Sequence, residues 1–289
     1  MPYICYNGDY IQKGLKMKII TKVEVLKKYL KAKEGTIGYV PTMGALHDGH
    51  LSLIKTARKE CDIVIISIFV NPTQFLKGED LDKYPSRDEA DKKICELCGV
   101  DVVFLPNVSE IYGEDEVRVV APNIRGFVLE GATRPGHFDG VLSVVNKLFH
   151  IVNPDFAYFG KKDAQQLNLI TLMVKQLFMN VVIVPVDTVR ESDGLALSSR
   201  NIYLSTVQRE EALKISSSLY EASKLVSRGN FNAKEIKEEM LKILNPLEIG
   251  YVEILNRDFE MINEVKIGES VILVEALVGE TRLLDNIWL

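Results

Sequence analysis

Two histidines, His47 and His50, stand three residues apart where a predicted strand gives way to a predicted helix. A helix start presents unpaired backbone N–H groups and the positive end of the helix dipole, and both attract phosphate. Two imidazoles there can neutralise charge on a transferring phosphoryl group, and they titrate near neutral pH. The alternative is a pair of surface histidines on a helix cap. We favour the functional interpretation, because two of the chain's four histidines lie here beside Gly44 and Gly49.

Two other loops carry side chains suited to a small anionic substrate. NPTQF follows a buried apolar run, and its Gln74 offers a donor and acceptors for hydroxyl and carboxylate groups. A turn-stabilising amide explains Gln74 equally well. In RPGHFDG, Arg134 and His137 can meet an anion or close a cleft.

The loop FGKKD follows a predicted strand and precedes a predicted helix. Lysine at a helix start is a common phosphate ligand, which makes Lys161 and Lys162 candidates. Asp163 also suits a helix N-cap. Gln166, three residues further along, lies on the same side of the predicted helix start.

The loop VRESDGLALSSRN carries Arg190, Ser198, Ser199 and Arg200. Hydroxyl groups and a guanidinium can hold a triphosphate without a glycine-rich P-loop. No GxxxxGK[ST], GxGxxG, GxSxG or zinc-binding spacing occurs, which removes the sequence basis for P-loop transfer, dinucleotide redox chemistry, serine hydrolysis and zinc catalysis. Nucleotide binding through histidines, lysine and a serine-arginine loop remains, and it points to adenylyl transfer.

The cysteines suggest neither a metal site nor a disulfide framework. Cys95 and Cys98 form a CELC pair without a second CxxC or a nearby histidine, so we favour a packing or helix-surface role. The absence of a disulfide pattern fits a reducing compartment.

The elements that must position these loops alternate between strands and helices. Near-continuous apolar strands such as the one predicted over 62–69 indicate a parallel sheet covered on both faces. We therefore predict an α/β fold with a Rossmann-like, doubly wound parallel sheet over residues 17–191. In such sheets ligands bind beyond the carboxyl ends of strands, where the polar loops lie. The segment 131–140 is predicted as a loop, followed by a helix over 141–152.

The alternation of strands and helices ends after Asn201. Charged amphipathic helices are predicted over 206–229 and 232–244, followed by two strands and the ending TRLLDNIWL. We predict a smaller C-terminal α+β lid domain over 192–289, with the cleft between the domains as the default binding site. We interpret residues 1–16 as an N-terminal extension, disordered or the product of a mis-set start.

Charge and hydropathy limit the possible partners. A net charge of −5 and a pI near 5.6 argue against a nucleic-acid footprint. The longest apolar run, over 63–70, is far shorter than the roughly 20 residues that span a bilayer, so we expect no membrane insertion. The N-terminus lacks a basic start and an apolar core, so we expect a cytoplasmic protein.

Taken together, these loops resemble the pantothenate synthetase family, the pantoate:beta-alanine ligases of coenzyme A biosynthesis within the nucleotidyltransferase superfamily. The resemblance covers Met17 to the C-terminus and rests on motifs in their expected order: PTMGALHDGH, FVNPTQF, RPGHFDGV, FGKKDAQQ, VRESDGLALSSRNIYLS and TRLLDN. It implies that ATP activates pantoate to pantoyl adenylate with release of pyrophosphate. Beta-alanine then attacks to give pantothenate and AMP.

Residue roles follow from the same motifs. The resemblance implies that His50 is the proton donor, that His47 and Lys162 contact phosphates, and that Asp163 contacts the ribose. Gln74 and Gln166 would bind pantoate, with Gln74 also near beta-alanine, while Arg134 and His137 shape the substrate side. The full implied ATP set is Met43, Gly44, Ala45, Leu46, His47, Asp48, Gly49, His50, Gly160, Lys161, Lys162, Asp163, Val189, Leu197, Ser198, Ser199 and Arg200.

The sequence departs from the family pattern at two places, with YPSRD from Tyr84 where the family has YPR[ST], and LSSR where it has MSSR. The first departure blurs which carboxylate supports Mg²⁺, and we assign Asp91 by its distance from Gln74. The second conserves volume. The family also implies a homodimer.

The sequence is also compatible with three alternatives. The same fold could serve a nucleotide-cofactor adenylyltransferase or cytidylyltransferase, which a pantoate-dependent ATP–pyrophosphate exchange assay separates from the ligase. A non-catalytic nucleotide-binding subunit would bind ATP without amine-dependent release of AMP. A tRNA ligase is disfavoured by the acidic balance and by the lack of an anticodon-binding module.

Overall fold

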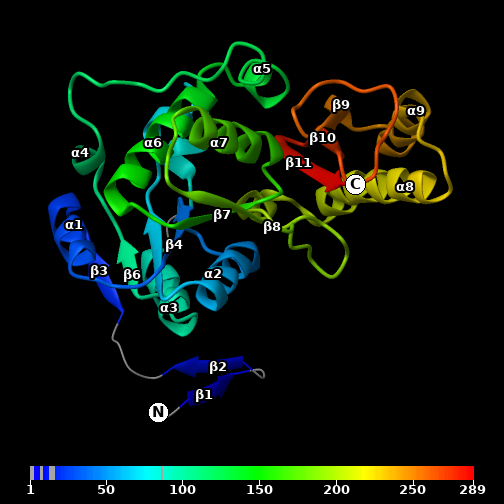
Figure 1. Ribbon diagram of the computed structural model, residues 1–289. Coiled ribbons are helices and arrows are strands. Elements are labelled where there is room, and N and C mark those ends of the chain that lie inside the picture. The colour runs from blue at the N-terminus through cyan, green and yellow to red at the C-terminus, as the bar shows by residue number, and fades with distance from the viewer. Residues whose placement is uncertain (1–2, 7–8, 13–16, 86) are drawn as a thin grey trace. The chain divides into compact units, whose positions relative to one another are not determined.

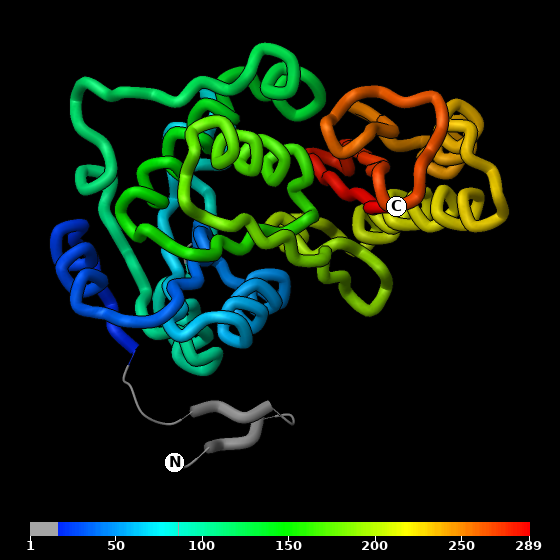
Figure 2. The backbone as a smooth tube through the Cα atoms, viewed as in Figure 1, coloured from blue at the N-terminus to red at the C-terminus, as the bar shows by residue number. Residues whose placement is uncertain are grey.

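The computed structural model describes residues 3–6, 9–12, 17–85 and 87–289 of the chain, and these form two compact units. The first unit comprises Met1–Phe159 and Leu169–Val186, and the second comprises Gly160–Asn168 and Asp187–Leu289. The chain therefore passes between the units three times along its length, and the FGKKD loop is grouped with the C-terminal residues. Figures 1 and 2 trace this path by colour.

A six-stranded sheet forms the centre of the first unit, with the strand order β3-β6-β5-β4-β7-β8. The pairs from β3 through β7 are parallel, which confirms the predicted Rossmann-like sheet. All six residues of β5 are buried, as expected for a central strand covered on both faces. The strands are β3 (Lys18–Ile20), β4 (Ile37–Thr42), β5 (Ile63–Ile68), β6 (Val102–Phe104), β7 (Phe156–Gly160) and β8 (Val182–Val186).

Helices cover both faces of this sheet, as Figure 1 shows. On one face, Val40 and Ile66 pack with Ile54 of α2 and Cys95 of α3 in a buried cluster. On the other, the Tyr39 ring meets Phe149 of α6 edge-on at 6.4 Å. Neighbouring residues of β4 thus serve opposite faces, as the pleat of a strand requires. The helices are α1 (Val23–Lys31), α2 (Asp48–Glu60), α3 (Asp88–Leu97), α4 (Val108–Ile111), α5 (Glu130–Thr133), α6 (His137–Val152) and α7 (Ala164–Gln176), with short 3₁₀ turns η1 (Pro72–Gln74) and η2 (Asp80–Lys83).

One predicted boundary is wrong. The segment 131–140 was expected to be a loop, but α5 ends within it and α6 begins at His137, four residues before the predicted helix start. Gly140, which favoured a loop, is a helical residue instead. A Cβ atom there would lie 2.3 Å from the carbonyl oxygen of Thr73, so glycine permits η1 to pack directly against α6.

The second unit contains a three-stranded antiparallel sheet with the order β11-β10-β9. Helices α8 and α9 contribute apolar side chains such as Leu219 and Met240 to a buried cluster shared with the sheet. This confirms the smaller α+β region at the C-terminal end. The elements are η3 (Ser199–Tyr203), α8 (Thr206–Ser227), α9 (Ala233–Leu244), β9 (Glu248–Asn256), β10 (Ser270–Val278) and β11 (Thr281–Trp288).

Within residues 1–16, predicted as an extension, the structure describes only β1 (Tyr3–Tyr6) and β2 (Asp9–Gln12), which pair antiparallel. The rest of that prediction lies outside the described residues. Among the described helices, none combines the length and apolar character needed to cross a bilayer.

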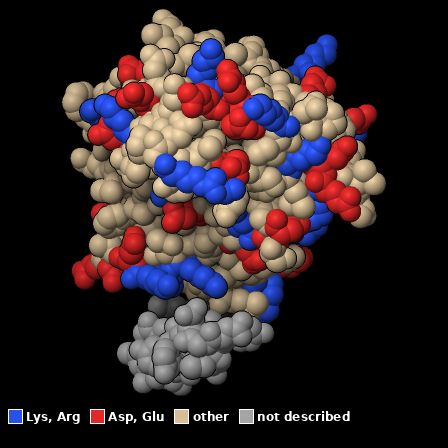
Figure 3. Space-filling view, turned by 90° about the vertical axis from the view of Figure 1, so that its right-hand side faces the viewer, with Lys and Arg blue, Asp and Glu red and all other residues tan. Residues whose placement is uncertain are grey.

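Acidic and basic side chains are intermixed on the molecular face drawn in Figure 3. Some charged side chains of the described residues pair within a helix, for example Lys224 with Glu221 on α8 at 2.9 Å. Such solvent-accessible pairs contribute little to stability, about 0.2–1 kcal/mol each, and are typical of an ordinary solvated surface.

Candidate functional site

The two histidines of the β4–α2 loop form the cap of helix α2. His47 is the N-cap residue, and its Nδ1 accepts the N–H of Gly49 at 3.2 Å. The His50 Nδ1 accepts the N–H of His47 at 3.3 Å, which completes a capping box built from two imidazoles. Their ring centroids are 4.2 Å apart. A Cβ atom at Gly49 would lie 2.8 Å from Cε1 of His47, so any larger residue there would displace the His47 ring.

This capping fixes the proton positions in the neutral rings. An Nδ1 atom that accepts a hydrogen bond cannot carry the proton, so in both neutral imidazoles the proton is on Nε2. Each ring is therefore oriented as an Nε2–H donor at the start of a helix. The helix-cap interpretation and the functional interpretation of these histidines are compatible, since the cap itself aims the donors.

The backbone before the cap is held by Asp91 of α3. Its side chain is 1% exposed, and its two carboxylate oxygens accept the N–H groups of Ala45 at 2.8 Å and Leu46 at 2.9 Å. Gly44 and Ala45 both have positive φ angles, of 88° and 51°. Glycine adopts such an angle without cost, but for Ala45 it is unfavourable, so the turn needs such support. The observed contacts make Asp91 a buried anchor for the loop between β4 and α2.

Gln74 lies at the end of η1, where a buried asparagine orients it. Asn71 is 1% exposed and donates from Nδ2 to Gln74 Oε1 at 3.0 Å and to the Gly140 carbonyl at 3.2 Å. The Gln74 side-chain amide in turn donates to the sulfur of Met43 at 3.2 Å. The structure therefore brings the predicted substrate residue Gln74 next to the predicted nucleotide loop.

Arg134 and His137 contact the backbone carbonyl of Gln74. The Arg134 guanidinium binds both carboxylate oxygens of Glu79, at 2.6 and 2.5 Å, and also donates to the Gln74 carbonyl at 3.3 Å. His137 Nδ1 lies 2.7 Å from the same carbonyl, and its Nε2 lies 3.1 Å from Arg134 Nη1. The predicted direct contact of these two residues with substrate stays a prediction. Their observed contacts instead position Gln74.

Burial and the adjacent Arg134 guanidinium lower the pKa of His137 from 6.5 to about 4. Donation from Nδ1–H to Gln74 and acceptance at Nε2 from Arg134 are possible together only in the neutral ring. Folding therefore becomes less favourable as the pH falls from 6.5 towards 4, because the unfolded chain binds the proton more tightly than the folded one.

In the second unit, the turn before α7 carries Lys161, Lys162 and Asp163. Lys161 Nζ pairs with Asp187 at 2.6 Å, while Lys162 Nζ lies 3.6 Å from Asp163 Oδ1. Gly160, the last residue of β7, leads into this turn, and Gln166 lies in the first turn of α7.

The second predicted nucleotide loop of this unit is a short hairpin that ends in η3. The N–H of Leu197 donates to the Val189 carbonyl at 3.0 Å, and Ser198 caps η3 by accepting the Arg200 N–H at 3.3 Å. Ser199 is the first residue of η3.

These two segments line a common hollow in the second unit. Its empty volume is about 450 Å³ with open solvent included. Lys162, Asp163, Ser198 and Arg200, all predicted to contact ATP, are among its walls. The remaining lining residues are Leu195, Ala196, Asn201, Ile215, Arg282, Leu283, Leu284 and Asp285.

The pantoate-beta-alanine ligase family model matches residues 18–288, which is nearly the whole chain. The chain belongs to the pantoate-beta-alanine ligase family. This confirms both the family resemblance and the enzyme class, since its members are ligases.

Relatives of the family agree over almost the full length. The chain is 64% identical over 273 residues to a pantothenate synthetase of Sulfurimonas denitrificans, covering 94% of this chain and all of that protein. It is 57% identical, with the same coverage, to a pantothenate synthetase of Aliarcobacter butzleri. The crystal structure of pantothenate synthetase from Thermus thermophilus superposes with a TM-score of 0.90 at 40% identity, covering 94% of this chain and 99% of that one. These matches confirm the ligase fold.

A further solved relative is a pantoate-beta-alanine ligase of Francisella tularensis, whose crystal structure is complexed with beta-gamma ATP and beta-alanine. Its TM-score is 0.78 at 35% identity, covering 94% of this chain and 98% of that one.

Several residues of the site were missed by the sequence interpretation. Glu79 neutralises Arg134, and Tyr112 donates its hydroxyl to Asn71 Oδ1 at 2.7 Å. Asp285 and Asn286 lie in the TRLLDN motif, which had marked the family without suggesting a role. That motif was the available signal for the last two, because polar residues are unusual in a buried strand.

Proposed function

We propose that the chain catalyses the ATP-dependent condensation of pantoate with beta-alanine, giving pantothenate, AMP and pyrophosphate through pantoyl adenylate. The product would enter coenzyme A biosynthesis. The observation that carries this proposal is the shared hollow, in which Lys162, Asp163, Ser198 and Arg200 converge in a chain of this ligase family. The Francisella relative in complex with beta-gamma ATP and beta-alanine supports the choice of both ligands.

In the first half-reaction, a pantoate carboxylate oxygen attacks the α-phosphorus of ATP. The new O–P bond forms as the bond to pyrophosphate breaks, so no covalent enzyme intermediate is required. Catalysis then depends on alignment and on neutralising the phosphate charge. Lys162, Ser198, Ser199 and Arg200 would contact phosphates, and Asp163 would contact the ribose.

His50 would act as proton donor to the departing phosphate, with His47 as a phosphate ligand. Their capping contacts support these roles, because they leave Nε2–H as the protonated ring position in both residues. General-acid help of this kind contributes about 10²–10⁴-fold to a rate.

Pantoate would be bound by Gln74 and Gln166. Gln74 suits this task because Asn71 and Met43 orient its amide while Arg134 and His137 hold its backbone carbonyl. We assign Arg134 and the neutral His137 a positioning role through that carbonyl, since both already have partners in the protein.

In the second half-reaction, the neutral amine of beta-alanine attacks the acyl carbon of pantoyl adenylate. A C–N bond forms, the amine loses a proton, and the bond to AMP breaks. Gln74 would also contact beta-alanine.

Mg²⁺ would accompany ATP and neutralise pyrophosphate charge. Asp91 does not fit the metal-ligand role predicted for it, because it is buried and both of its oxygens accept backbone N–H groups. Among the described residues no group of three or more histidine, cysteine and acidic side chains could hold a metal. We therefore assign the metal to the nucleotide's own phosphates. A homodimer and a cytoplasmic location, where ATP is supplied, complete the proposal.

Mass detection of the products tests the function directly. Wild-type protein incubated with ATP, pantoate and beta-alanine should form pantothenate and AMP in equal amounts. Omission of beta-alanine should leave pantoate-dependent exchange between ATP and pyrophosphate. Production of AMP without pantothenate would contradict the proposal.

A further inference from the structure

The last strand of the chain carries two buried polar side chains to which the proposed function gives no task. Asp285 and Asn286 of β11 are 4% and 3% exposed. Burial of such groups is unfavourable unless they are hydrogen-bonded, so their partners indicate what they do. Both sets of partners belong to the segments that line the hollow of the second unit.

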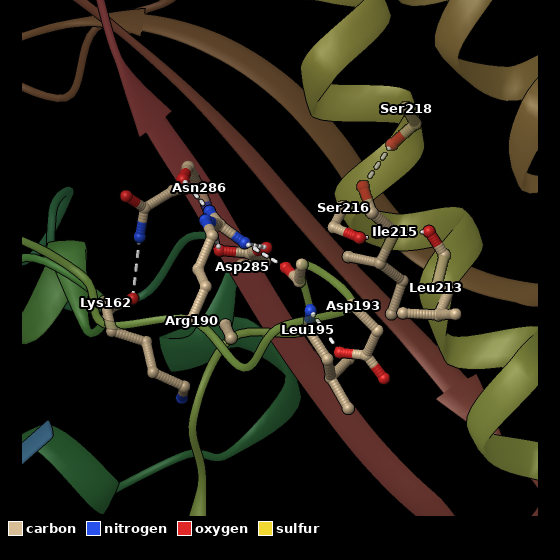
Figure 4. Close-up of polar contacts among 12 residues, drawn as sticks. Lys162, Arg190, Asp193, Leu195, Leu213, Ile215, Ser216, Ser218, Asp285 and Asn286 are labelled. Carbon is tan, nitrogen blue, oxygen red and sulfur yellow. Dashed lines mark hydrogen bonds and ion pairs between the residues drawn. The ribbon is translucent and has the colours of Figure 1, made fainter. Parts of the chain in front are cut away.

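Asn286 holds the turn that carries Lys162. Its side-chain amide donates to the carbonyl oxygens of Lys161 at 2.9 Å and of Lys162 at 2.7 Å. Trp288, two residues further along β11, also donates from Nε1 to the Lys161 carbonyl at 3.3 Å. Figure 4 shows the Asn286 amide directed at the Lys162 backbone, while the Lys162 side chain extends away from it. The strand therefore fixes the backbone and leaves the lysine ammonium to the hollow.

Asp285 holds the hairpin that leads to Ser198 and Arg200. Its two carboxylate oxygens accept from both terminal nitrogens of Arg190, at 2.6 and 2.9 Å, in a bidentate pair. Arg190 extends this contact into the hairpin by donating to the Gly194 carbonyl at 3.1 Å. Figure 4 shows the guanidinium lying against the Asp285 carboxylate.

The two contacts are also joined to each other. Asp285 Oδ1 accepts the backbone N–H of Asn286 at 2.8 Å, and Arg190 donates to the Asn286 carbonyl at 3.3 Å. One dipeptide thus connects the Lys162 turn with the Arg190 hairpin. Lys162, Ser198, Arg200 and Asp285 all line the same hollow, so a shift of either segment would change the distance between its cations.

We propose that Asp285 and Asn286 are positioning residues for ATP, which set the spacing of the Lys162 turn and the Ser198–Arg200 segment. This inference rests on the proposed function for its ligand. Triphosphate binding depends on that spacing, because the phosphate charges must meet Lys162 and Arg200 together. Binding of beta-alanine does not depend on it.

The test compares Asn286→Leu and Arg190→Lys with wild type. Leucine keeps the branched shape of asparagine, although it is larger, and removes both donors, while lysine keeps the charge of Arg190 and removes the bidentate geometry. Controls come from the same unit. Asn256→Leu removes an asparagine that fastens the turn after β9, where its Oδ1 accepts the N–H of Asp258 at 2.9 Å, and Glu253→Gln removes a partly buried ion pair with Lys237.

Two measurements are made on each protein: the ATP dissociation constant by calorimetry, and the KM values for ATP and beta-alanine. We expect both variants to weaken ATP binding and raise the KM for ATP by about tenfold or more. The KM for beta-alanine should change by less than twofold, and both controls should match wild type. A purely structural role would lower only the active fraction and leave every KM unchanged.

The failures are distinguishable. ATP affinity and KM within twofold of wild type in folded variants would overturn the positioning role. If wild type binds ATP but forms no pantothenate, the proposed function fails while the dissociation constants still decide the inference. Absence of ATP binding by wild type would overturn both. Should Asn286→Leu not fold, Arg190→Lys decides alone, because its side chain is 32% exposed and its replacement leaves the core intact.

Discussion

His50 combines two tasks that a single pair of substitutions can separate. Its Nδ1 caps helix α2 by accepting the His47 N–H, while Nε2–H is the proposed proton donor. In His50→Asn, the asparagine Oδ1 is the same number of bonds from Cβ as the histidine Nδ1 that it replaces. The cap can therefore persist while the Nε2–H donor is lost. His50→Ala removes both.

The expected magnitudes differ between stability and rate. Loss of a cap costs about 1 kcal/mol, within a usual range of roughly 0.5–2 kcal/mol. In a unit of this size that corresponds to a melting temperature lower by about 2–4 °C for His50→Ala, with little change for His50→Asn. Loss of a general acid predicts slowing of adenylate formation by about 10²–10⁴-fold in both variants.

Rapid-quench measurement of pantoyl adenylate in a single turnover gives the rate, and thermal unfolding gives the stability. His150→Asn is the matched control, because its imidazole is exposed on α6, where its Nδ1 lies 2.8 Å from the Asn146 carbonyl. If His50→Asn forms the adenylate within threefold of the wild-type rate while His50→Ala is slow, capping is the function of His50 and the proton-donor assignment is refuted.

Three further outcomes follow from the first unit. Asp91→Asn loses one of two charge-assisted bonds to the Ala45–Leu46 turn, so we expect a loss of about 2–3 kcal/mol in unfolding experiments with denaturant and a raised KM for ATP. Asp62→Asn, which weakens a similar contact to Thr36 at the other end of β4, should leave that KM unchanged. In Gly140→Ala the added methyl group must displace η1, and calorimetry should show destabilisation together with a higher KM for pantoate. For His137, the lowered pKa predicts that its titration between pH 6.5 and 4 removes up to about 3 kcal/mol of stability, so His137→Gln should make the fall in stability over this range smaller.

The sheet and most helices could be predicted from local pattern. The apolar run of β5 predicts a buried strand, and the helical spacing of apolar residues in α7 predicts a helix, because burial follows directly from side-chain type. The start of α6 could not be predicted in the same way. Gly140 is a helical residue because η1, nearly 70 residues away in sequence, packs against it, and a local pattern contains no sign of that contact.

The site divides similarly. Loop positions after predicted strands made Gln74, Lys162 and Ser198 candidates, since ligands of this fold class bind beyond the carboxyl ends of strands. The sequence positions did not show which side chains these loop residues contact. Glu79 takes up the charge of Arg134 from 55 residues away, and Asp285 takes up that of Arg190 from 95 residues away. A sequence shows that a cation exists, but only the fold shows whether an internal carboxylate already neutralises it.

The chain's three passages between its units restrict how this protein can be recombined with its relatives. The second unit is assembled from Gly160–Asn168 and Asp187–Leu289, so its parts are not contiguous in the gene. A single crossover at residue 187 would join Asn286 of one parent to the Lys161–Lys162 carbonyls of another. Chimaeras made at one junction should therefore lose activity more often than those that exchange both segments together, and the C-terminal unit is inherited as a pair of sequence blocks.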